Sequence, residues 1–274
     1  MNPAISVRNL SKRFQKKIAV DNVTFDVEPG EFFGFLGPNG AGKTTTIKML
    51  CGMMKCDAGE ARVAGIDVFN DPLGVKARIG VLPDTIETFD RLTGWELVNF
   101  CGLLYSIPEA ETKRRAVVLL DLLSLSDEDR GKLVIDYSMG MKKKVGLACA
   151  LIHGPEVLFL DEPFNGIDPI ATAAIQVVLN DLASKGVTIF FTSHVLEVVE
   201  KICTRIGIIK DGRLLAAGTR SELAAFADLG SSASLSDVFV RVVGGVATPA
   251  KALDWIASKS PAPLAAEPPV NPSF

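Results

Sequence analysis

Residues 37–44 read Gly-Pro-Asn-Gly-Ala-Gly-Lys-Thr, and this stretch decides the fold. It fits the pattern GxxxxGKS/T at every fixed position. An apolar run at 32–36 precedes it and a helical pattern at 44–51 follows it, which is the strand-to-helix context that phosphate binding requires. Glycines let backbone N–H groups curve around a phosphate, and the helix N-terminus favours its negative charge. The alternative, a glycine-rich turn before a helix, is disfavoured because every fixed position and both flanks are present.

Four polar residues predict the chemistry of the bound ligand. Lys43 can reach the β- and γ-phosphates of a nucleotide, and the Thr44 hydroxyl can ligate Mg²⁺. Asp161 and Glu162 follow the apolar strand pattern at 157–160, and ligands bind at that end of a parallel sheet. We therefore expect Asp161 to hold Mg²⁺ through water and Glu162 to polarise an attacking water, in preference to solvated turn residues.

The chain contains two histidines, His153 and His194. His194 follows the strand pattern at 188–192, so it stands at the same sheet edge and can donate to a γ-phosphate. An ordinary packing or surface role stays open for His194. His153 precedes Gly-Pro in a predicted loop, and we interpret it as a structural residue.

Composition excludes several other classes of protein. The 274 residues carry a net charge of −3, unlike the strongly basic domain of a dedicated nucleic-acid binder. Apolar residues make up 48% of the chain and the mean hydropathy is +0.29, which predicts a large core or a partner surface. The longest uncharged runs, at 97–108 and 169–180, are shorter than the roughly 20 apolar residues of a membrane-spanning helix.

The order of strand and helix patterns predicts an α/β fold. Strand patterns dominate the first part of the chain, helical spacing marks 85–155, and strands and helices alternate from 157 onward. Such alternation places a parallel sheet between helices. The predicted strands are 5–10, 23–27, 32–36, 79–82, 157–160, 188–192 and 206–209, and the predicted helices are 44–51, 95–105, 113–123, 141–152, 169–184 and 195–202.

Residues 4–225 resemble the nucleotide-binding subunit of an ATP-binding cassette (ABC) transporter. The resemblance is specific because it rests on motifs in a fixed order rather than on one motif. These motifs are the adenine-stacking aromatic Phe14, the Walker A loop 37–44, Asp84 at the Q-loop position, the signature 137–141, the Walker B strand and glutamate 157–162, the D-loop 165–168 and the switch histidine His194.

Three positions depart from the family pattern. The usual signature Leu-Ser-Gly-Gly-Gln is here Tyr-Ser-Met-Gly-Met, which is similar to the type-2 exporter group. Asp84 replaces the Q-loop glutamine; it keeps an oxygen for Mg²⁺ but is shorter and charged. Asn165 replaces the D-loop serine, which we expect to be a mild change. For Asp84 two interpretations stay open: a plain turn residue, or a hinge that senses the γ-phosphate through Mg²⁺.

The resemblance implies a P-loop NTPase cassette with a mixed sheet core, an N-terminal antiparallel β part and a helical subdomain at about 85–155. It also implies that two copies, identical or different, sandwich two ATP molecules head to tail and drive a separate integral-membrane permease. The chain would then lie on the cytoplasmic face of the cell membrane, with no nucleic-acid partner. The residues it implies are Glu162 and His194 for catalysis, Thr44, Asp84 and Asp161 for Mg²⁺, and Phe14, Gly37, Pro38, Asn39, Gly40, Ala41, Gly42, Lys43, Thr44, Thr45, Ser138, Gly140 and Asp168 for the nucleotide.

We expect an ATP-binding domain at 1–228, a C-terminal helical extension at 229–259 and a flexible, proline-rich tail at 260–274. Lysines 142–144 are interpreted as a solvated helical face rather than as phosphate contacts. Several apolar residues of the helical block have two interpretations, ordinary core or a groove for an amphipathic partner helix. They are Phe89, Leu92, Trp95, Phe100 and Tyr105.

Three functions compete for this set of motifs. A transport ATPase is favoured. A soluble ABC ATPase of ribosomes or nucleic acid usually carries two cassettes, coiled-coil insertions or basic extensions, and this chain shows one cassette and an acidic balance. A P-loop kinase or GTPase would lack the signature and the switch histidine.

Overall fold

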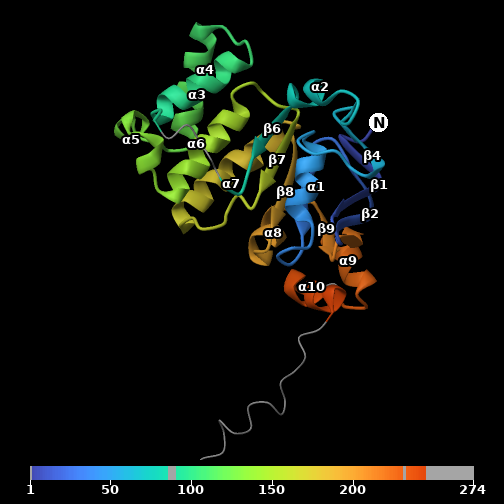
Figure 1. Cartoon of the computed structure of the whole chain (residues 1–274). Coiled ribbons are helices and arrows are strands. Elements are labelled where there is room, and N and C mark those ends of the chain that lie inside the picture. Colours follow the sequence, from blue (N-terminus) through green and yellow to red (C-terminus); the bar gives the residue numbers. More distant parts are fainter. Residues whose placement is uncertain (1, 86–90, 231–232, 245–274) are drawn as a thin grey trace, which may run out of the picture. The chain divides into compact units, whose positions relative to one another are not determined.

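The structure, a computed structural model, describes residues 2–85, 91–230 and 233–244 (Figure 1). Two β-sheets lie beside a block of helices that is formed by the middle of the chain. Within the described residues, no helix combines the length and the apolar character needed to cross a membrane.

The N-terminal sheet has the strand order β2-β1-β4-β5, and its strands are antiparallel. Val7 pairs with Phe25 across β1 and β2, and both side chains are buried. This sheet confirms the antiparallel part expected from the sequence, although β2 begins before the predicted run at 23–27. The strands are β1 (Ile5–Phe14), β2 (Lys17–Val27), β4 (Ala58–Val63) and β5 (Ile66–Asp67).

The central sheet has six strands in the order β10-β9-β3-β8-β7-β6. Its neighbouring strands are parallel except for the hairpin of β9 and β10, so the predicted mixed sheet is confirmed. The hairpin strand β10 has no counterpart among the predicted strands. The strands are β3 (Phe32–Leu36), β6 (Ile79–Leu82), β7 (Val157–Asp161), β8 (Thr188–Ser193), β9 (Arg205–Lys210) and β10 (Arg213–Gly218).

Successive residues of the central strands face two different hydrophobic cores. Phe32 and Phe191 belong to the core shared with the helical block, and their rings meet edge-on at 5.5 Å. Phe33 and Phe190 belong to the core shared with the N-terminal sheet, and their rings stack at 5.6 Å. Because β3, β7 and β8 are buried on both faces, they read as continuous apolar runs.

Helices follow the carboxyl ends of the central strands. α1 (Lys43–Leu50) follows β3, α7 (Pro169–Ser184) follows β7, and α8 (Leu196–Ile202) follows β8. Asp168 caps α7 and proline occupies the first turn, as the sequence predicts. The remaining helices around the sheets are α2 (Pro72–Lys76), α9 (Arg220–Phe226) and α10 (Leu235–Val243).

The helical block spans the predicted helical region and forms one side of the molecule's described part (Figure 1). Hydroxyl side chains begin three of its helices: Thr93 in a capping box with Glu96, Ser126, and Ser138. The block packs on the central sheet through buried leucines. It contains α3 (Gly94–Leu104), α4 (Glu109–Leu122), α5 (Asp127–Gly131), the 3₁₀ helix η1 (Val134–Asp136) and α6 (Met139–Leu151).

The described residues up to Val243 form one compact unit. The expected boundary after residue 228 falls between α9 and α10, and Leu235 and Val238 of α10 lie in the same core as Leu223 of α9. The expected extension at 229–259 therefore contains α10, and its remainder from residue 245, like the expected tail at 260–274, lies outside the described residues.

Gly80→Ala should lower the free energy of unfolding by about 1–3 kcal/mol, because a methyl group there would lie 2.3 Å from the Ala150 carbonyl oxygen. The clash would separate β6 from α6. Urea unfolding measures the effect. Gly131→Ala is the control, since open space surrounds a Cβ at that helical position and alanine is the better helix former. Equal unfolding free energies for the two variants would contradict the close packing of β6 on α6.

Candidate nucleotide-binding site

The loop between β3 and α1 has a backbone that requires glycine at two positions. Gly42 has a φ of +109°, and a Cβ there would lie 2.3 Å from the Ala19 carbonyl oxygen. A Cβ on Gly37 would lie 2.3 Å from the Ile209 carbonyl oxygen. Without side chains at these positions, the loop keeps the tight curve that lets backbone N–H groups surround an anion.

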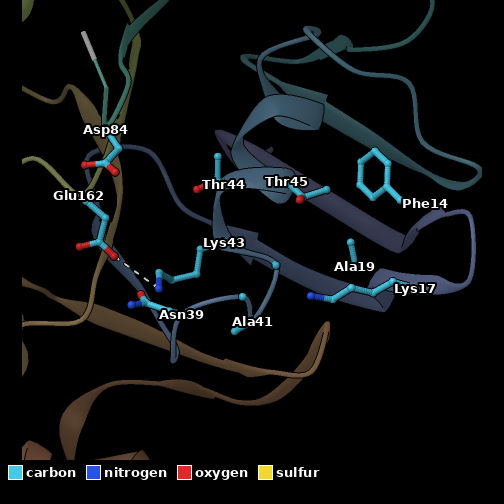
Figure 2. Close-up of a pocket in the computed structure, with 12 residues that line it drawn as sticks. Phe14, Lys17, Ala19, Asn39, Ala41, Lys43, Thr44, Thr45, Asp84 and Glu162 are labelled. Atoms are coloured by element: carbon cyan, nitrogen blue, oxygen red, sulfur yellow. Dashed lines mark ion pairs between the residues drawn. The ribbon is translucent and has the colours of Figure 1, made fainter.

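Lys43 is held inside this loop with its side chain only 7% exposed. Its Nζ donates a hydrogen bond to the Gly37 carbonyl oxygen at 2.7 Å and lies 3.4 Å from Glu162 Oε1 (Figure 2). Glu162 follows β7, which is separated from β3 by β8 in the sheet. The sheet therefore brings a cation and a carboxylate together from distant parts of the sequence.

A pocket of about 320 Å³ opens beside this pair. Figure 2 shows Phe14 at one end of the pocket, with Asp84 and Glu162 at the other. Gly37 and Pro38 are not among its lining residues; their carbonyl oxygens accept hydrogen bonds from Lys43. The predicted residues that line the pocket are Phe14, Asn39, Gly40, Ala41, Gly42, Lys43, Thr44, Thr45, Asp84 and Glu162.

Asp161 and Glu162 share one hydroxyl partner on the neighbouring strand. The Thr192 Oγ1 donates to Asp161 Oδ1 at 2.6 Å and accepts from the Glu162 backbone N–H at 3.0 Å. Asp161 and Thr192 are both buried, so each hydrogen bond is protected from water. Glu162 adopts a φ of +47°, a left-handed conformation that is rare for a residue with a side chain.

His194 lies next to the Glu162 carboxylate. Its Nδ1 is 2.9 Å from Glu162 Oε2, and its side chain is 46% exposed. The two oxygens of Glu162 thus face two different groups, Lys43 on one side and His194 on the other. This arrangement fixes the direction in which the carboxylate points.

Lys143 corrects one expectation from the sequence. The interpretation of residues 142–144 as a solvated face is wrong for Lys143, whose side chain is 1% exposed. Its Nζ donates to the backbone carbonyl oxygen of Asp84 at 2.7 Å and lies 3.7 Å from the Asp84 carboxylate. Burial lowers the pKa of Lys143, and the nearby carboxylates of Asp84 and Asp161 oppose that shift.

Ser138, Gly140 and Asp168 form a second group, away from the pocket lining. Ser138 Oγ accepts from the Met141 backbone N–H and begins α6. A Cβ on Gly140 would lie 3.4 Å from Asp168 Oδ2, so the first turns of α6 and α7 lie close together. Hydrogen bonds from two backbone N–H groups at the start of α7 lower the pKa of Asp168.

The large apolar residues singled out in the helical block are divided between core and surface. Leu92 and Trp95 are half-buried against the core, which fits the ordinary interpretation. Tyr105 stacks on His153 with ring centroids 3.8 Å apart, and His153 Nε2 lies 3.0 Å from the Ile79 carbonyl oxygen, so His153 is a packing residue as expected. Phe100 is exposed, and Phe89 lies outside the described residues.

The sequence interpretation missed three residues of the site: Lys17, Thr192 and Lys143. Lys17 lines the pocket and points toward the glycine loop in Figure 2. Lys17 is the first residue of β2 and pairs with Phe14, so its nearness to Phe14 in the sequence was an available signal. Thr192 stands at the end of a buried strand beside β7, where a polar residue requires a partner.

These features define a P-loop nucleoside triphosphatase. The glycine loop and Lys43 suit a phosphate group, and Glu162 is a carboxylate at the same pocket that can accept a proton from water.

Comparisons with known proteins refine this class. The family model described as ABC transporter matches residues 20–165. The linearmycin resistance ATP-binding protein LnrL of Bacillus subtilis (strain 168) is 38% identical over 219 residues, which cover 80% of this chain and 70% of LnrL. The daunorubicin resistance ATP-binding protein DrrA3 of Streptomyces coeruleorubidus is 38% identical over 222 residues, which cover 81% of this chain and 70% of DrrA3. A solved structure of an ATP-binding subunit of an ABC transporter matches with a TM-score of 0.82 and 31% identity, covering 88% of this chain and 100% of that one.

The chain belongs to the ABC transporter ATP-binding family, and it is an ATPase subunit of that family. This confirms the resemblance inferred from the ordered motifs. Two further relatives, 40% and 41% identical, are matched over 59% and 62% of their length, so the chain spans less than two thirds of those proteins.

Thr192→Val should reduce ATP turnover at least ~10-fold, because it leaves the Asp161 carboxylate and the Glu162 N–H buried without their shared partner. The matched control is Thr188→Val at the other end of β8, where the lost hydroxyl accepts from the Gly30 N–H. We expect both variants to lose about 1–3 kcal/mol of unfolding free energy, and only the first to lose turnover. Steady-state ATPase rates and urea unfolding separate the two effects. Similar turnover in both variants would remove Thr192 from the site.

Proposed function

We propose that this chain hydrolyses ATP to drive a separate integral-membrane permease, as the ATPase subunit of an exporter. The observation that carries the proposal is the Lys43–Glu162 pair, 3.4 Å apart at a pocket that Phe14 and Thr44 also line. The names of LnrL and DrrA3 refer to resistance against linearmycin and daunorubicin, which supports export of a compound. Its identity depends on the membrane partner, where the transport path would lie.

In this proposal, Phe14 stacks on the adenine ring, and the loop from Gly37 to Thr45 surrounds the phosphates. Phe14 is 43% exposed at the open end of the pocket, so its ring is accessible to a base. Lys43 neutralises charge on the β- and γ-phosphates, which requires its ammonium to exchange the Gly37 carbonyl oxygen for phosphate oxygens.

Glu162 is the proposed general base for the attacking water. Its charged and polar neighbours support this role, because a carboxylate held between Lys43 and His194 is oriented before the substrate binds. A neutral His194 ring that donates from Nδ1 to Glu162 has an acceptor at Nε2. Donation from Nε2 to the γ-phosphate therefore requires the imidazolium form.

The donor set suits Mg²⁺. Thr44 and Asp84 both line the pocket and offer hard oxygen ligands. Among the described residues, no group of three or more His, Cys, Asp or Glu side chains could hold a metal. Mg²⁺ commonly takes one or two protein ligands together with phosphate oxygens and water, so a small number of protein oxygen ligands is sufficient. When bound, the ion would supply positive charge at the phosphates. Asp161, which is not among the lining residues, would hold it through water.

We further propose a head-to-tail dimer of cassettes. Ser138, Gly140 and Asp168 stand together at the first turns of α6 and α7, outside the pocket lining. Two neighbouring helix N-termini favour an anion. We propose that Ser138, Gly140 and Asp168 face the γ-phosphate bound by a second cassette subunit, which is either identical to this chain or a different chain. Each ATP site would then need residues from both subunits.

We place the ATP-binding domain at residues 1–228, with its helical subdomain at 85–155. The permease would bind this helical subdomain. Several large apolar side chains of α3 and α4 are exposed, which supports a partner helix on this block. Binding there would hold the chain at the cytoplasmic face of the membrane. The exposed side chains are Phe100, Leu103, Leu104, Val117, Val118 and Leu122.

Glu162→Gln tests the proposed function. The amide keeps the size of the side chain but accepts protons poorly, so turnover should fall at least ~100-fold while ATP still binds with Mg²⁺. The variant should accumulate as an ATP-dependent dimer, measured by size-exclusion chromatography. Glu156→Gln, just before β7 and 58% exposed, is the control and should hydrolyse ATP normally. A monomeric Glu162→Gln protein with normal turnover would refute the assignment.

Asp84→Ala should bind ATP almost normally but lose the turnover that the permease stimulates, if Asp84 is the proposed hinge. Asp84→Gln restores the family residue and should keep much of that stimulation, since an amide oxygen can also ligate Mg²⁺. The membrane protein that co-purifies with the chain is identified by mass spectrometry and reconstituted for this assay. Equal stimulation of wild type and Asp84→Ala would leave Asp84 as a turn residue.

A further inference from the structure

Lys143 is a buried cation that the proposed reaction does not use. It lies on α6 with 1% of its side chain exposed, whereas its neighbours Lys142 and Lys144 are only partly buried. Burying an ammonium group is costly unless its charge and its donors are matched. Lys143 therefore needs an explanation beyond core packing.

Its three N–H donors meet three backbone carbonyl oxygens. Lys143 Nζ donates to Asp84 at 2.7 Å, to Pro83 at 3.2 Å and to Glu162 at 3.2 Å. A lysine ammonium has three donors, so this set is complete. The acceptors come from two segments, the two residues after β6 and the residue after β7, and the donor comes from α6. One side chain thus links three elements.

The contact with Lys143 is one of three hydrogen bonds that hold the strained backbone of Glu162. Glu162 has a φ of +47°, a conformation that persists when the surroundings hold it. Its N–H donates to Thr192 Oγ1 at 3.0 Å, and its carbonyl oxygen accepts from Lys143 Nζ and from the Asn165 backbone N–H, each at 3.2 Å. The peptide groups on both sides of the Glu162 Cα are therefore fixed, and with them the direction of its carboxylate toward Lys43 and His194.

We propose that Lys143 is a positioning residue of ATP hydrolysis. It helps to keep the Glu162 carboxylate oriented toward Lys43 and His194. Its hydrogen bonds also connect the backbone of Glu162 and of Asp84 to α6, the helix that Ser138 caps. A displacement of α6 would then move the backbone of the general base. This inference rests on the proposed function, in which Glu162 activates water.

Lys143→Met removes all three donors at similar length, and Lys143→Gln keeps two of them. We expect kcat to fall at least ~10-fold in Lys143→Met and less in Lys143→Gln, with KM for ATP changed by less than about twofold, since the phosphate loop is untouched. Hydrogen exchange of a peptide containing the Glu162 amide should also be faster. Lys142→Met, on the same helix, is the matched control. If Lys143→Met does not fold, Lys143→Gln carries the test.

Several results would overturn the proposal: equal kcat values in the Lys143 and Lys142 variants, a loss expressed in KM alone, or unchanged exchange at Glu162. Assays run well below the thermal midpoint of every variant, so that a kcat loss does not reflect unfolding. The Glu162→Gln protein separates the two claims. If it loses turnover and Lys143→Met does not, only the role of Lys143 fails; if it keeps turnover, the proposed function fails first.

Discussion

The register of β8 between β3 and β7 is the constraint on which the rest of the structure depends. β8 pairs Ser193 with Leu36 on one side and Thr192 with Asp161 on the other, which brings the phosphate loop and the carboxylates to one sheet edge. Because these strands are apolar at most positions on both faces, the pattern of apolar side chains alone does not fix the register. A buried hydrogen bond of 2.6 Å between the paired residues Thr192 and Asp161 ties β8 to β7 in the observed register.

The strand register affects the chemistry of the site through the position of Glu162. Its left-handed backbone costs about 1–3 kcal/mol, and hydrogen bonds to Thr192 and from Lys143 and the Asn165 N–H hold it. Its carboxylate then lies between Lys43 and His194. These partners lie on α1, on α6, on β8 and in the segments that follow β7 and β8, so the orientation of one side chain depends on the packing of the sheet against α1 and α6. Such preorganisation is what a hydrolytic site needs.

Motifs whose chemistry is local could be predicted from the sequence, and contacts set by tertiary packing could not. The strands at 32–36 and 79–82 and the helix at 169–184 match the structure, because buried strands and a capped helix carry their own signals. The prediction for Lys143 was wrong because three consecutive lysines suggest a solvent-exposed helix face. Helical spacing nevertheless places Lys143 on the same face of α6 as the buried Leu147. Strand β10 was missed although Asp-Gly at 211–212 is a hairpin signal.

Because the two hydrophobic cores lie on opposite faces of the central sheet, neighbouring phenylalanines of one strand report on different parts of the molecule. Phe32 and Phe191 pack in the core shared with the helical block, whereas Phe33 and Phe190, one residue away in each strand, pack in the core shared with the N-terminal sheet. A fluorine label on one ring of each pair would give two resonances from a single chain, each responding to a different half of the molecule. Spectroscopy could thus follow whether a nucleotide disturbs both halves together or one after the other.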